Sequence, residues 1–81
     1  MKMVEAIAKR LSTLMDEKKI SQYELAKRAT IDASTIYNII YGRVKTVTIE
    51  TLWLISVALD MTVQQFLDHP LFDKDAIDIP T

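Results

Sequence analysis

The segment from Ser21 to Gly42, SQYELAKRATIDASTIYNIIYG, constrains the fold of this chain more than any other part, because it carries the start and stop signals of two short helices. Ser21 is a favourable N-cap, and Glu24 three residues later would complete a capping box. A second helix is expected to begin after Asp32, another N-cap residue. Gly42 would end it, since glycine readily adopts the left-handed conformation found after helix C-termini.

The residues around the first cap support the same interpretation. Ile20 and Leu25 are placed to form a hydrophobic staple, which fixes the angle at which the chain enters the helix. Two helices of about this length, joined by three or four residues, form the unit that places a recognition helix in the major groove of DNA. The segment therefore predicts a helix-turn-helix.

Helical periodicity extends over nearly the whole chain, because apolar residues recur at steps of three and four. We expect five helices, at about residues 3–18, 22–29, 33–41, 49–59 and 63–68. Thr48 and Thr62 are the expected N-caps of the last two. The expected core residues are Val4, Ile7, Leu11, Leu14, Met15, Leu25, Ala26, Ala29, Ile36, Ile39, Leu52, Ile55, Ala58 and Leu59. No strand is needed, so the predicted fold class is all-α.

Length and composition exclude several classes of protein. Eighty-one residues form one domain, near the lower limit for a core without cross-links. The absence of cysteine excludes disulfides and cysteine-based zinc sites and is compatible with the cytoplasm. No apolar run approaches the roughly 20 residues that cross a bilayer, and the N-terminus lacks the apolar stretch of a signal peptide. We expect a cytoplasmic protein without a membrane partner.

The charge is unevenly distributed, although the net charge is only −1 and the pI about 5.7. Residues 1–45 hold nine basic and five acidic side chains, a net charge of +4. Residues 46–81 hold one basic and six acidic side chains, a net charge of −5. Halves of opposite sign fit a protein with one face on phosphate, although ordinary sequence variation would also produce such a difference.

Two stretches, ISQYELAKRATIDASTIYNIIYG and TIETLWLISVALDMTVQQFL, carry a resemblance to a known family. They are similar to the DNA-binding domains of lambda-type phage repressors, the Xre-like (Cro/cI-type) helix-turn-helix family. The match covers about residues 4–67 and includes the S-Q-x-E-L-A start, the S-T-I step, the following glycine and the T-x-x-T-L opening. The resemblance implies a five-helix lambda-repressor-like domain with its helix-turn-helix at the second and third helices.

The resemblance also assigns DNA contacts to particular residues. The glutamine that opens the second helix contacts phosphate in such domains and supports the recognition helix, and the first exposed positions of the third helix face base edges. The predicted DNA-binding residues are Gln22, Ala33, Ser34, Thr35, Asn38, Arg43 and Lys45.

The chemistry of these side chains agrees with those roles. Asn38 can bond adenine through two hydrogen bonds, Ser34 and Thr35 can bond bases or phosphates, and Ala33 can contact a thymine methyl. Arg43 and Lys45 (in the loop after the helix) suit contacts to phosphate. Each also fits a simpler role: Ser34 and Thr35 are common in a first helical turn, and Arg43 and Lys45 would be at home in a solvated loop.

Three features depart from the family pattern. Thr30 stands where the turn usually has glycine, so either the turn differs or it carries strain of about 1–3 kcal/mol. Ile40 occupies a position that is often acidic. The base-facing edge of the third helix contains no arginine, which suggests that specificity rests on few contacts and on DNA shape.

The helix expected at residues 49–59 is apolar on all sides. Leu52, Ile55 and Leu59 share one side, and a second apolar group lies opposite: Trp53, Leu54 and Val57. Two coverings are possible for that second face. Either the tail, residues 70–81, folds back over it through Leu71, Phe72, Ile77 and Ile79, or the face pairs with a second copy in a homodimer.

Signals for catalysis and for metal binding are weak. His69 is the only histidine, and it lies at an expected helix end. The acidic residues of the tail, Asp73, Asp75 and Asp78, lack the glycine and closing glutamate of a calcium loop. No set of nucleophile, base and orienting residue is recognisable, and no glycine loop for phosphate. We therefore expect neither an enzyme nor a cofactor.

The sequence thus predicts a helix-turn-helix domain at residues 1–69, followed by the tail at residues 70–81. Its predicted function is sequence-specific binding of double-stranded DNA by a small transcriptional regulator of prophage or bacterial type. The expected protein partner is a second copy of the chain, in a homodimer. The alternative is a protein-interaction module, such as an antitoxin that masks a toxin. The acidic second half and the apolar faces of the 49–59 helix and of the tail favour that alternative, although the two roles can coexist.

Overall fold

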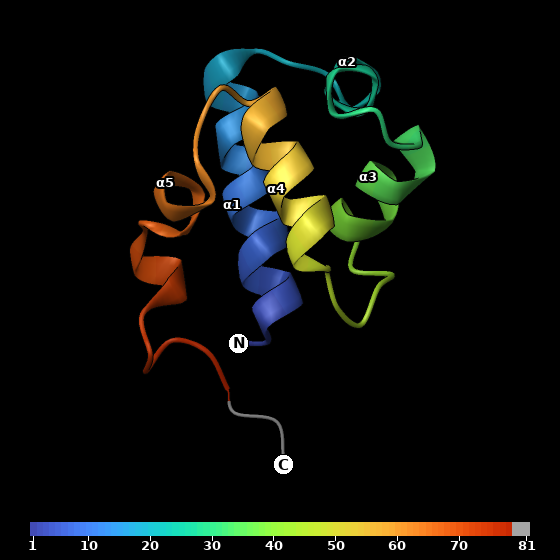
Figure 1. Ribbon diagram of the computed structural model, residues 1–81. Helices are drawn as coiled ribbons and strands as arrows, with labels where there is room; N and C mark the ends of the chain where they lie inside the picture. Colours follow the sequence, from blue (N-terminus) through green and yellow to red (C-terminus); the bar gives the residue numbers. More distant parts are fainter. Residues whose placement is uncertain (79–81) are drawn as a thin grey trace.

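The computed structural model describes residues 1–78, and this part of the chain folds into helices joined by short loops (Figure 1). The elements are α1 (Met3–Lys18), α2 (Gln22–Ala29), α3 (Ala33–Ile40), α4 (Ile49–Ala58), α5 (Val63–Leu67) and a short 3-10 helix, η1 (Pro70–Phe72). The all-α prediction is confirmed, and the five predicted helices all form. Three of them, α3, α4 and α5, end one residue earlier than predicted.

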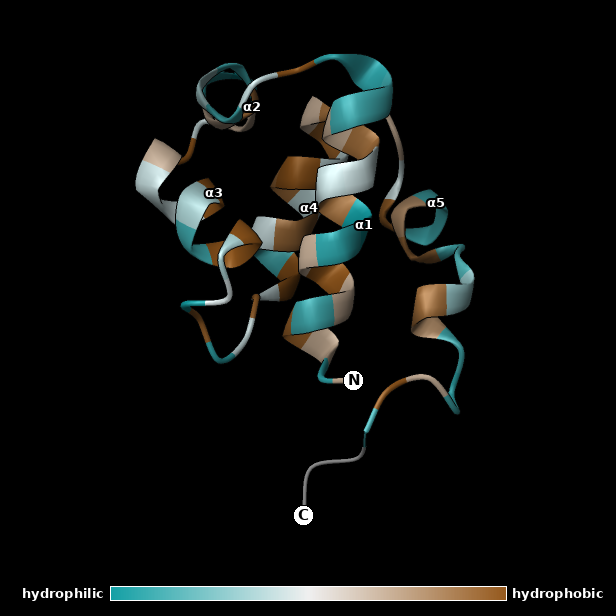
Figure 2. Ribbon diagram, turned by 180° about the vertical axis from the view of Figure 1, so that it is seen from behind, coloured by the Kyte–Doolittle hydropathy of each residue, from teal (hydrophilic) through white to brown (hydrophobic). Residues whose placement is uncertain are grey.

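The helices surround a single core. α1 and α4 face each other across it, with α2 and α3 on one side and α5 and η1 on the other (Figures 1 and 2). α2 packs on both α3 and α4, while α3 also contacts α1. α5 contacts α4, and η1 contacts α1. This arrangement leaves the outer side of α3 free at one end of the molecule.

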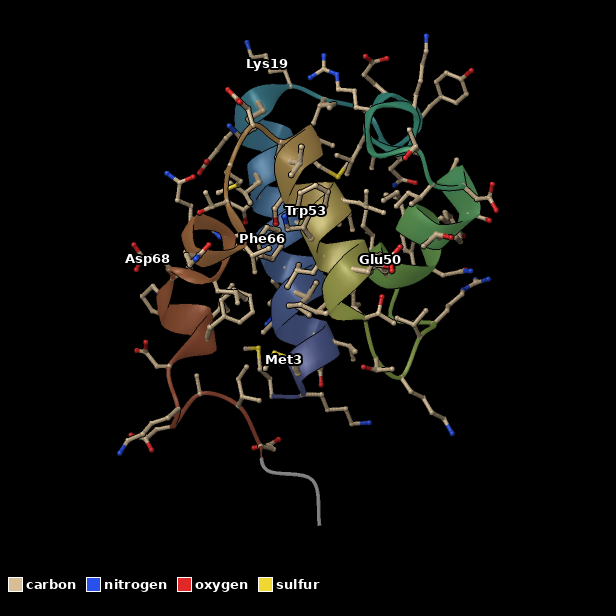
Figure 3. The ribbon with its side chains drawn as sticks, viewed as in Figure 1. Met3, Lys19, Glu50, Trp53, Phe66 and Asp68 are labelled. Carbon is tan, nitrogen blue, oxygen red and sulfur yellow. The ribbon has the colours of Figure 1, made fainter. Side chains whose placement is uncertain are left out.

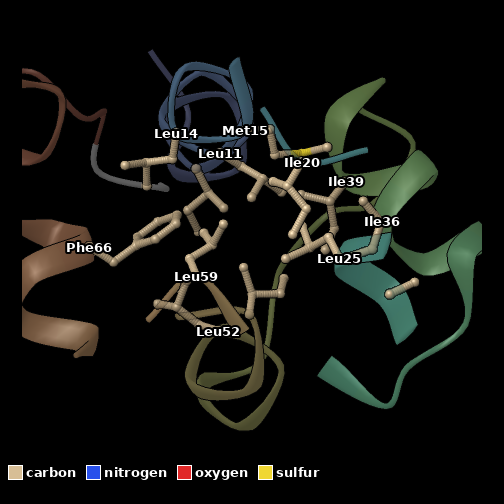
Figure 4. Packing of buried hydrophobic residues seen from close by; sticks show 13 residues of the cluster. Leu11, Leu14, Met15, Ile20, Leu25, Ile36, Ile39, Leu52, Leu59 and Phe66 are labelled. Carbon is tan, nitrogen blue, oxygen red and sulfur yellow. The ribbon is translucent and has the colours of Figure 1, made fainter. Parts of the chain in front are cut away.

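The core consists of buried aliphatic side chains with Phe66 among them (Figure 4). Phe66 and Leu11 are fully buried, as are Leu25, Ile36 and Ile55. The predicted core positions are buried except for two half-buried ones, Val4 and Ala58. Phe66 was missed because α5 has only five residues, too few to show a helical period.

Each of the first four helices ends in a turn whose central residue has a positive φ. The central residues are Lys19 (53°), Thr30 (57°), Gly42 (71°) and Asp60 (60°). In each turn two backbone N–H groups donate to carbonyls of the last helical turn, as after α3, where Gly42 donates to Ile39 and Arg43 to Asn38. The left-handed stop predicted at Gly42 is confirmed, and the other three turns are made without glycine.

The N-cap predicted at Ser21 is confirmed, whereas the side-chain cap predicted at Asp32 does not form. Ser21 Oγ accepts from the N–H of Glu24 at 3.1 Å, as predicted. The reciprocal half of that capping box was wrong, because Glu24 Oε1 accepts from Arg28 Nε at 3.0 Å instead. Asp32 stands at the N-cap of α3 with extended backbone, but its side chain accepts no capping hydrogen bond.

The caps of the last two helices are confirmed. Thr48 Oγ1 accepts from the N–H of Thr51 at 3.1 Å. Thr62 and Gln65 form a full capping box, with bonds of 3.0 and 2.8 Å in the two directions. These caps define the starts of α4 and α5 within the sequence.

The described part of the tail lies against the start of α1. The Met1 ammonium group donates to the Ala76 carbonyl at 3.0 Å, and the Asp78 N–H donates to the Met1 carbonyl at 2.9 Å. The Phe72 ring centroid is 6.2 Å from that of Phe66. Of the tail residues expected to cover α4, Ile79 lies outside the described residues. Within residues 70–78 that covering does not form, since η1 packs on α1.

Candidate nucleic-acid interface

α3 is held to the domain by one apolar side. Ile36 and Ile39 are buried in the core, and Ile40 packs half-buried against it. Because α3 has only eight residues, these contacts fix its rotation about its own axis. The opposite side therefore faces outward from the end of the molecule (Figure 1).

The outward arc of α3 contains some of the predicted base-facing residues. Ala33 and Ser34 are exposed in the first turn, and Asn38 is half-buried at the edge of the arc. Thr35 lies on the flank, half-buried, about 100° further round the helix than Ser34. The structure thus groups Ala33, Ser34 and Asn38 more closely than it groups Thr35 with them.

Two tyrosines that sequence reasoning missed stand on the same arc. Tyr37 is 41% exposed and Tyr41 is 58% exposed. Their ring centroids are 4.4 Å apart and the ring planes are tilted by 39°. The spacing of four residues from Ala33 to Tyr37 and from Tyr37 to Tyr41 is the signal that would have identified them. Tyr37 consequently lies on the exposed arc between Ala33 and Tyr41.

Arg43 is brought back toward α3 by the turn that follows the helix. Its N–H donates to the carbonyl of Asn38 at 2.8 Å, while the Gly42 N–H donates to Ile39 at 3.2 Å. The guanidinium carbon of Arg43 lies 5.3 Å from the centroid of the Tyr37 ring, within cation–π range. The side chain therefore lies against the aromatic face of α3.

A groove beside the end of α3 collects further positive charge. It is lined by Arg43 and Lys45 from the loop after α3 and by Lys2 from the start of α1. Glu5 also lines it, but its carboxylate accepts from the backbone N–H of Lys2 at 3.1 Å. Lys2 was not among the predicted contacts, because nothing in the sequence places the N-terminus next to this loop.

The turn between α2 and α3 keeps the geometry that glycine usually supplies. Thr30 has φ 57° and ψ 38°, and its hydroxyl donates to the carbonyl of Ala29 at 2.6 Å. The sequence left open whether the turn differs from the family pattern or holds Thr30 in a strained conformation. The structure shows the second: the left-handed turn is kept, with Thr30 in it. Gln22 is the first residue of α2 and is half-buried.

The charge difference between the two halves of the chain is separated in space only in part, because α1, with Lys9, Arg10 and Lys18, runs between the two ends. α2 and α3 lie at one end of the molecule, and α5 and the tail lie at the other, in both views (Figures 1 and 2). Asp68 projects from the end near α5, as Figure 3 shows. A phosphate backbone approaching α3 would thus meet the more basic end of the protein.

The outer face of α4 carries a stripe of exposed apolar side chains. Ile49 is 71% exposed, Trp53 54% and Val57 51%, and Leu54 beside them is half-buried. Trp53 projects outward from α4 in Figure 3. Ile49 was missed because it was treated only as the first residue of the helix. No described residue of the tail covers this stripe.

Residues 1–78 contain neither a cluster of metal-binding side chains nor a membrane-spanning helix. Within residues 1–78 no group of three or more His, Asp or Glu side chains lies close enough to hold a metal ion. No helix in the same part of the chain is long and apolar enough to cross a membrane.

Comparison with known families gives a match over most of the chain. The model of the Cro/C1-type helix-turn-helix DNA-binding domain matches residues 10–71. No curated protein sequence matches significantly.

Solved structures of the same kind of domain superimpose well. The master regulator for biofilm formation SinR, in complex with DNA, is 31% identical, with a TM-score of 0.69 over 76% of this chain and 98% of that one. The N-terminal DNA-binding domain of SinR from Bacillus subtilis is 29% identical, with a TM-score of 0.73 over 82% and 96%. The restriction-modification controller protein C.AhdI from Aeromonas hydrophila, 24% identical over 78% and 94%, shares the fold, with a TM-score of 0.72.

Proposed function

The chain belongs to the Cro/C1-type helix-turn-helix DNA-binding family, and from that premise we propose that it is a transcriptional regulator of bacterial or prophage type. It binds double-stranded DNA as a homodimer and acts in the cytoplasm, where bacterial DNA is found. α3 enters the major groove, and the two copies contact half-sites one helical turn apart, about 34–36 Å. The similarity to SinR, a master regulator whose structure was solved in complex with DNA, supports this proposal.

The single observation that carries the proposal is the exposed arc of α3. Ala33, Ser34 and Asn38 have short side chains that can contact base edges from this arc. Thr35 on the flank and Gln22 at the start of α2 are placed for contacts to the sugar-phosphate backbone. Lys45, in the loop after α3, adds a positive charge on the same side of the domain for a contact to phosphate.

The homodimer is proposed from the outer face of α4. Ile49, Trp53 and Val57 are spaced by four residues, so they form one continuous stripe along the helix, with Leu54 at its edge. An apolar stripe with a central tryptophan suits a two-fold interface, in which the same patch serves both copies. We assign the role of partner to a second copy of the chain.

Selection of bound duplexes from a random pool at moderate salt tests the proposal. We expect an enriched sequence with two related half-sites whose centres are about 10 base pairs apart. An enriched single half-site would refute the dimer while retaining DNA recognition. Recovery of the unselected pool, with no enriched sequence, would refute sequence-specific binding.

The antitoxin alternative receives no support from the matched family or from the similar structures. The exposed stripe on α4 is one of the features that favoured it, and the proposed homodimer accounts for that stripe. We do not propose a toxin partner.

A further inference from the structure

Arg43 differs from the other two arginines of the chain in what its guanidinium group contacts. Arg10 donates to the backbone carbonyls of Phe66 at 2.8 Å and Gln65 at 3.1 Å, so it is committed to the fold. Arg28 is paired with the Glu24 carboxylate at 3.0 Å. Within residues 1–78 the Arg43 guanidinium has no hydrogen-bond acceptor and no acidic partner, and its N–H donors are available to a ligand.

The position of Arg43 is fixed at the backbone and supported at the side chain. The turn after α3 ties its N–H to the carbonyl of Asn38, so the residue follows the recognition helix directly. The Tyr37 ring supports the guanidinium at 5.3 Å, and the Tyr41 ring lies 4.4 Å from that of Tyr37. A guanidinium supported by an aromatic ring keeps its planar fork of donors, which can still bond a ligand.

We infer that Arg43 reads a guanine in the major groove and that Tyr37 is the positioning residue that holds it there; this inference rests on the proposed function. Guanine presents the O6 and N7 acceptors that a planar guanidinium fork bonds through two parallel hydrogen bonds. The base-facing arc of α3 contains no arginine of its own, and Arg43 supplies that missing donor from the loop. Its role changes from the predicted phosphate contact to base recognition.

Lys45 provides the internal comparison. It lies two residues further along the same loop and lines the same groove, but among residues 1–78 no aromatic ring makes a cation–π contact with its ammonium group. An ammonium on a flexible stem acts as a point charge, which suits phosphate. In this proposal Arg43 contacts a base, and Lys45 contacts the phosphate backbone of the DNA.

The test uses the duplex that the wild-type protein selects, and variants at that guanine position. Arg43→Lys keeps the charge but loses the planar fork. We expect it to bind the selected duplex about 5- to 150-fold more weakly and to lose the preference for guanine at one position of each half-site. The slope of log K against log salt should stay unchanged, because the positive charge remains.

Lys45→Gln is the matched control. It should weaken binding to all duplexes alike and reduce the salt slope by about one unit. If Arg43→Lys keeps the guanine preference and Arg43→Gln behaves like Lys45→Gln, Arg43 contacts phosphate and the inference is refuted. If the wild-type protein selects no duplex at all, the proposed function fails as well, so the two failures are distinguishable.

The role of Tyr37 is tested separately. Tyr37→Leu should weaken the guanine preference by about two- to fivefold, the usual worth of an exposed cation–π contact. Tyr37→Phe keeps the aromatic ring and should keep the wild-type preference. In an Arg43→Lys background, Tyr37→Leu should change the guanine preference no further, because the two residues act as a unit. If Tyr37→Phe loses as much as Tyr37→Leu, the hydroxyl contacts DNA itself and the positioning role is refuted. Thermal unfolding of each variant confirms that it is folded.

Discussion

At the scale of the residue, Thr30 shows a conflict between local preference and the turn that the fold requires. A β-branched side chain disfavours positive φ, yet the turn between α2 and α3 holds Thr30 at 57°. The two backbone bonds of the turn, from Thr30 to Lys27 and from Ile31 to Ala26, and the packing on both sides maintain this conformation. The strained residue lies between the two helices of the DNA-binding unit.

We predict that Thr30→Gly stabilises the protein. Relief of the left-handed strain is worth about 1–2 kcal/mol, and the greater chain entropy of glycine in the unfolded state offsets about half of it. The expected gain is about 0.5–1 kcal/mol in the free energy of unfolding, measured by urea denaturation. A loss of stability would mean that the hydroxyl bond to Ala29 outweighs the strain.

Gly42→Ala is the complementary prediction. Gly42 has φ 71°, and a Cβ added there meets no atom within 4 Å, so the cost is conformational only. We expect a loss of about 1 kcal/mol in the free energy of unfolding. A loss several times larger would show that the turn carries a constraint beyond its backbone conformation.

At the scale of the element, the two helices of the DNA-binding unit begin in different ways. Ser21 caps α2 with its side chain, whereas Asp32 occupies the equivalent place before α3 without such a bond. Ser21→Ala should therefore cost about 1 kcal/mol of unfolding free energy. Asp32→Ala should cost less than about 0.5 kcal/mol, since only the favourable charge at the helix N-terminus is lost. Equal losses by urea denaturation would contradict this difference.

The same elements show what local sequence determines and what it does not. Cap residues and apolar spacing placed every helix boundary within one residue, because both signals act within one or two turns. The partner of Glu24 was not predictable, since a capping bond and an ion pair one turn away compete for the same carboxylate. Tyr37 was missed although its spacing of four residues from Ala33 places it on the same side of α3. The position of Lys2 beside Lys45 depends on tertiary packing alone.

At the scale of the whole molecule, the charges and the apolar stripe give the protein two separate working surfaces. The basic end carries α3, and the exposed stripe of Ile49, Trp53 and Val57 runs along α4. α4 uses its inner side for the core and leaves the outer side uncovered by residues 70–78. The domain thus has one surface proposed for DNA and another proposed for a second copy.

Trp53→Glu should convert the proposed dimer to a monomer. A carboxylate at the centre of an apolar interface would be buried without a partner, which is strongly unfavourable. Sedimentation at micromolar concentration should show the wild type as a dimer and the variant as a monomer. Met3→Glu, at an exposed apolar residue of α1 outside the stripe, should leave the dimer intact. A monomeric wild type, or a variant that remains dimeric, would contradict the α4 interface.

The most direct test of the central claim is the affinity of a double variant, Ser34→Ala with Asn38→Ala, for the duplex that the wild type selects. Both side chains lie on the outward side of α3 and outside the core, so the variant should fold normally. If α3 reads the bases, equilibrium titration at fixed salt should show binding at least about tenfold weaker, with much of the preference over unrelated DNA lost. Unchanged affinity for the selected duplex would contradict the assignment of α3 as the recognition helix.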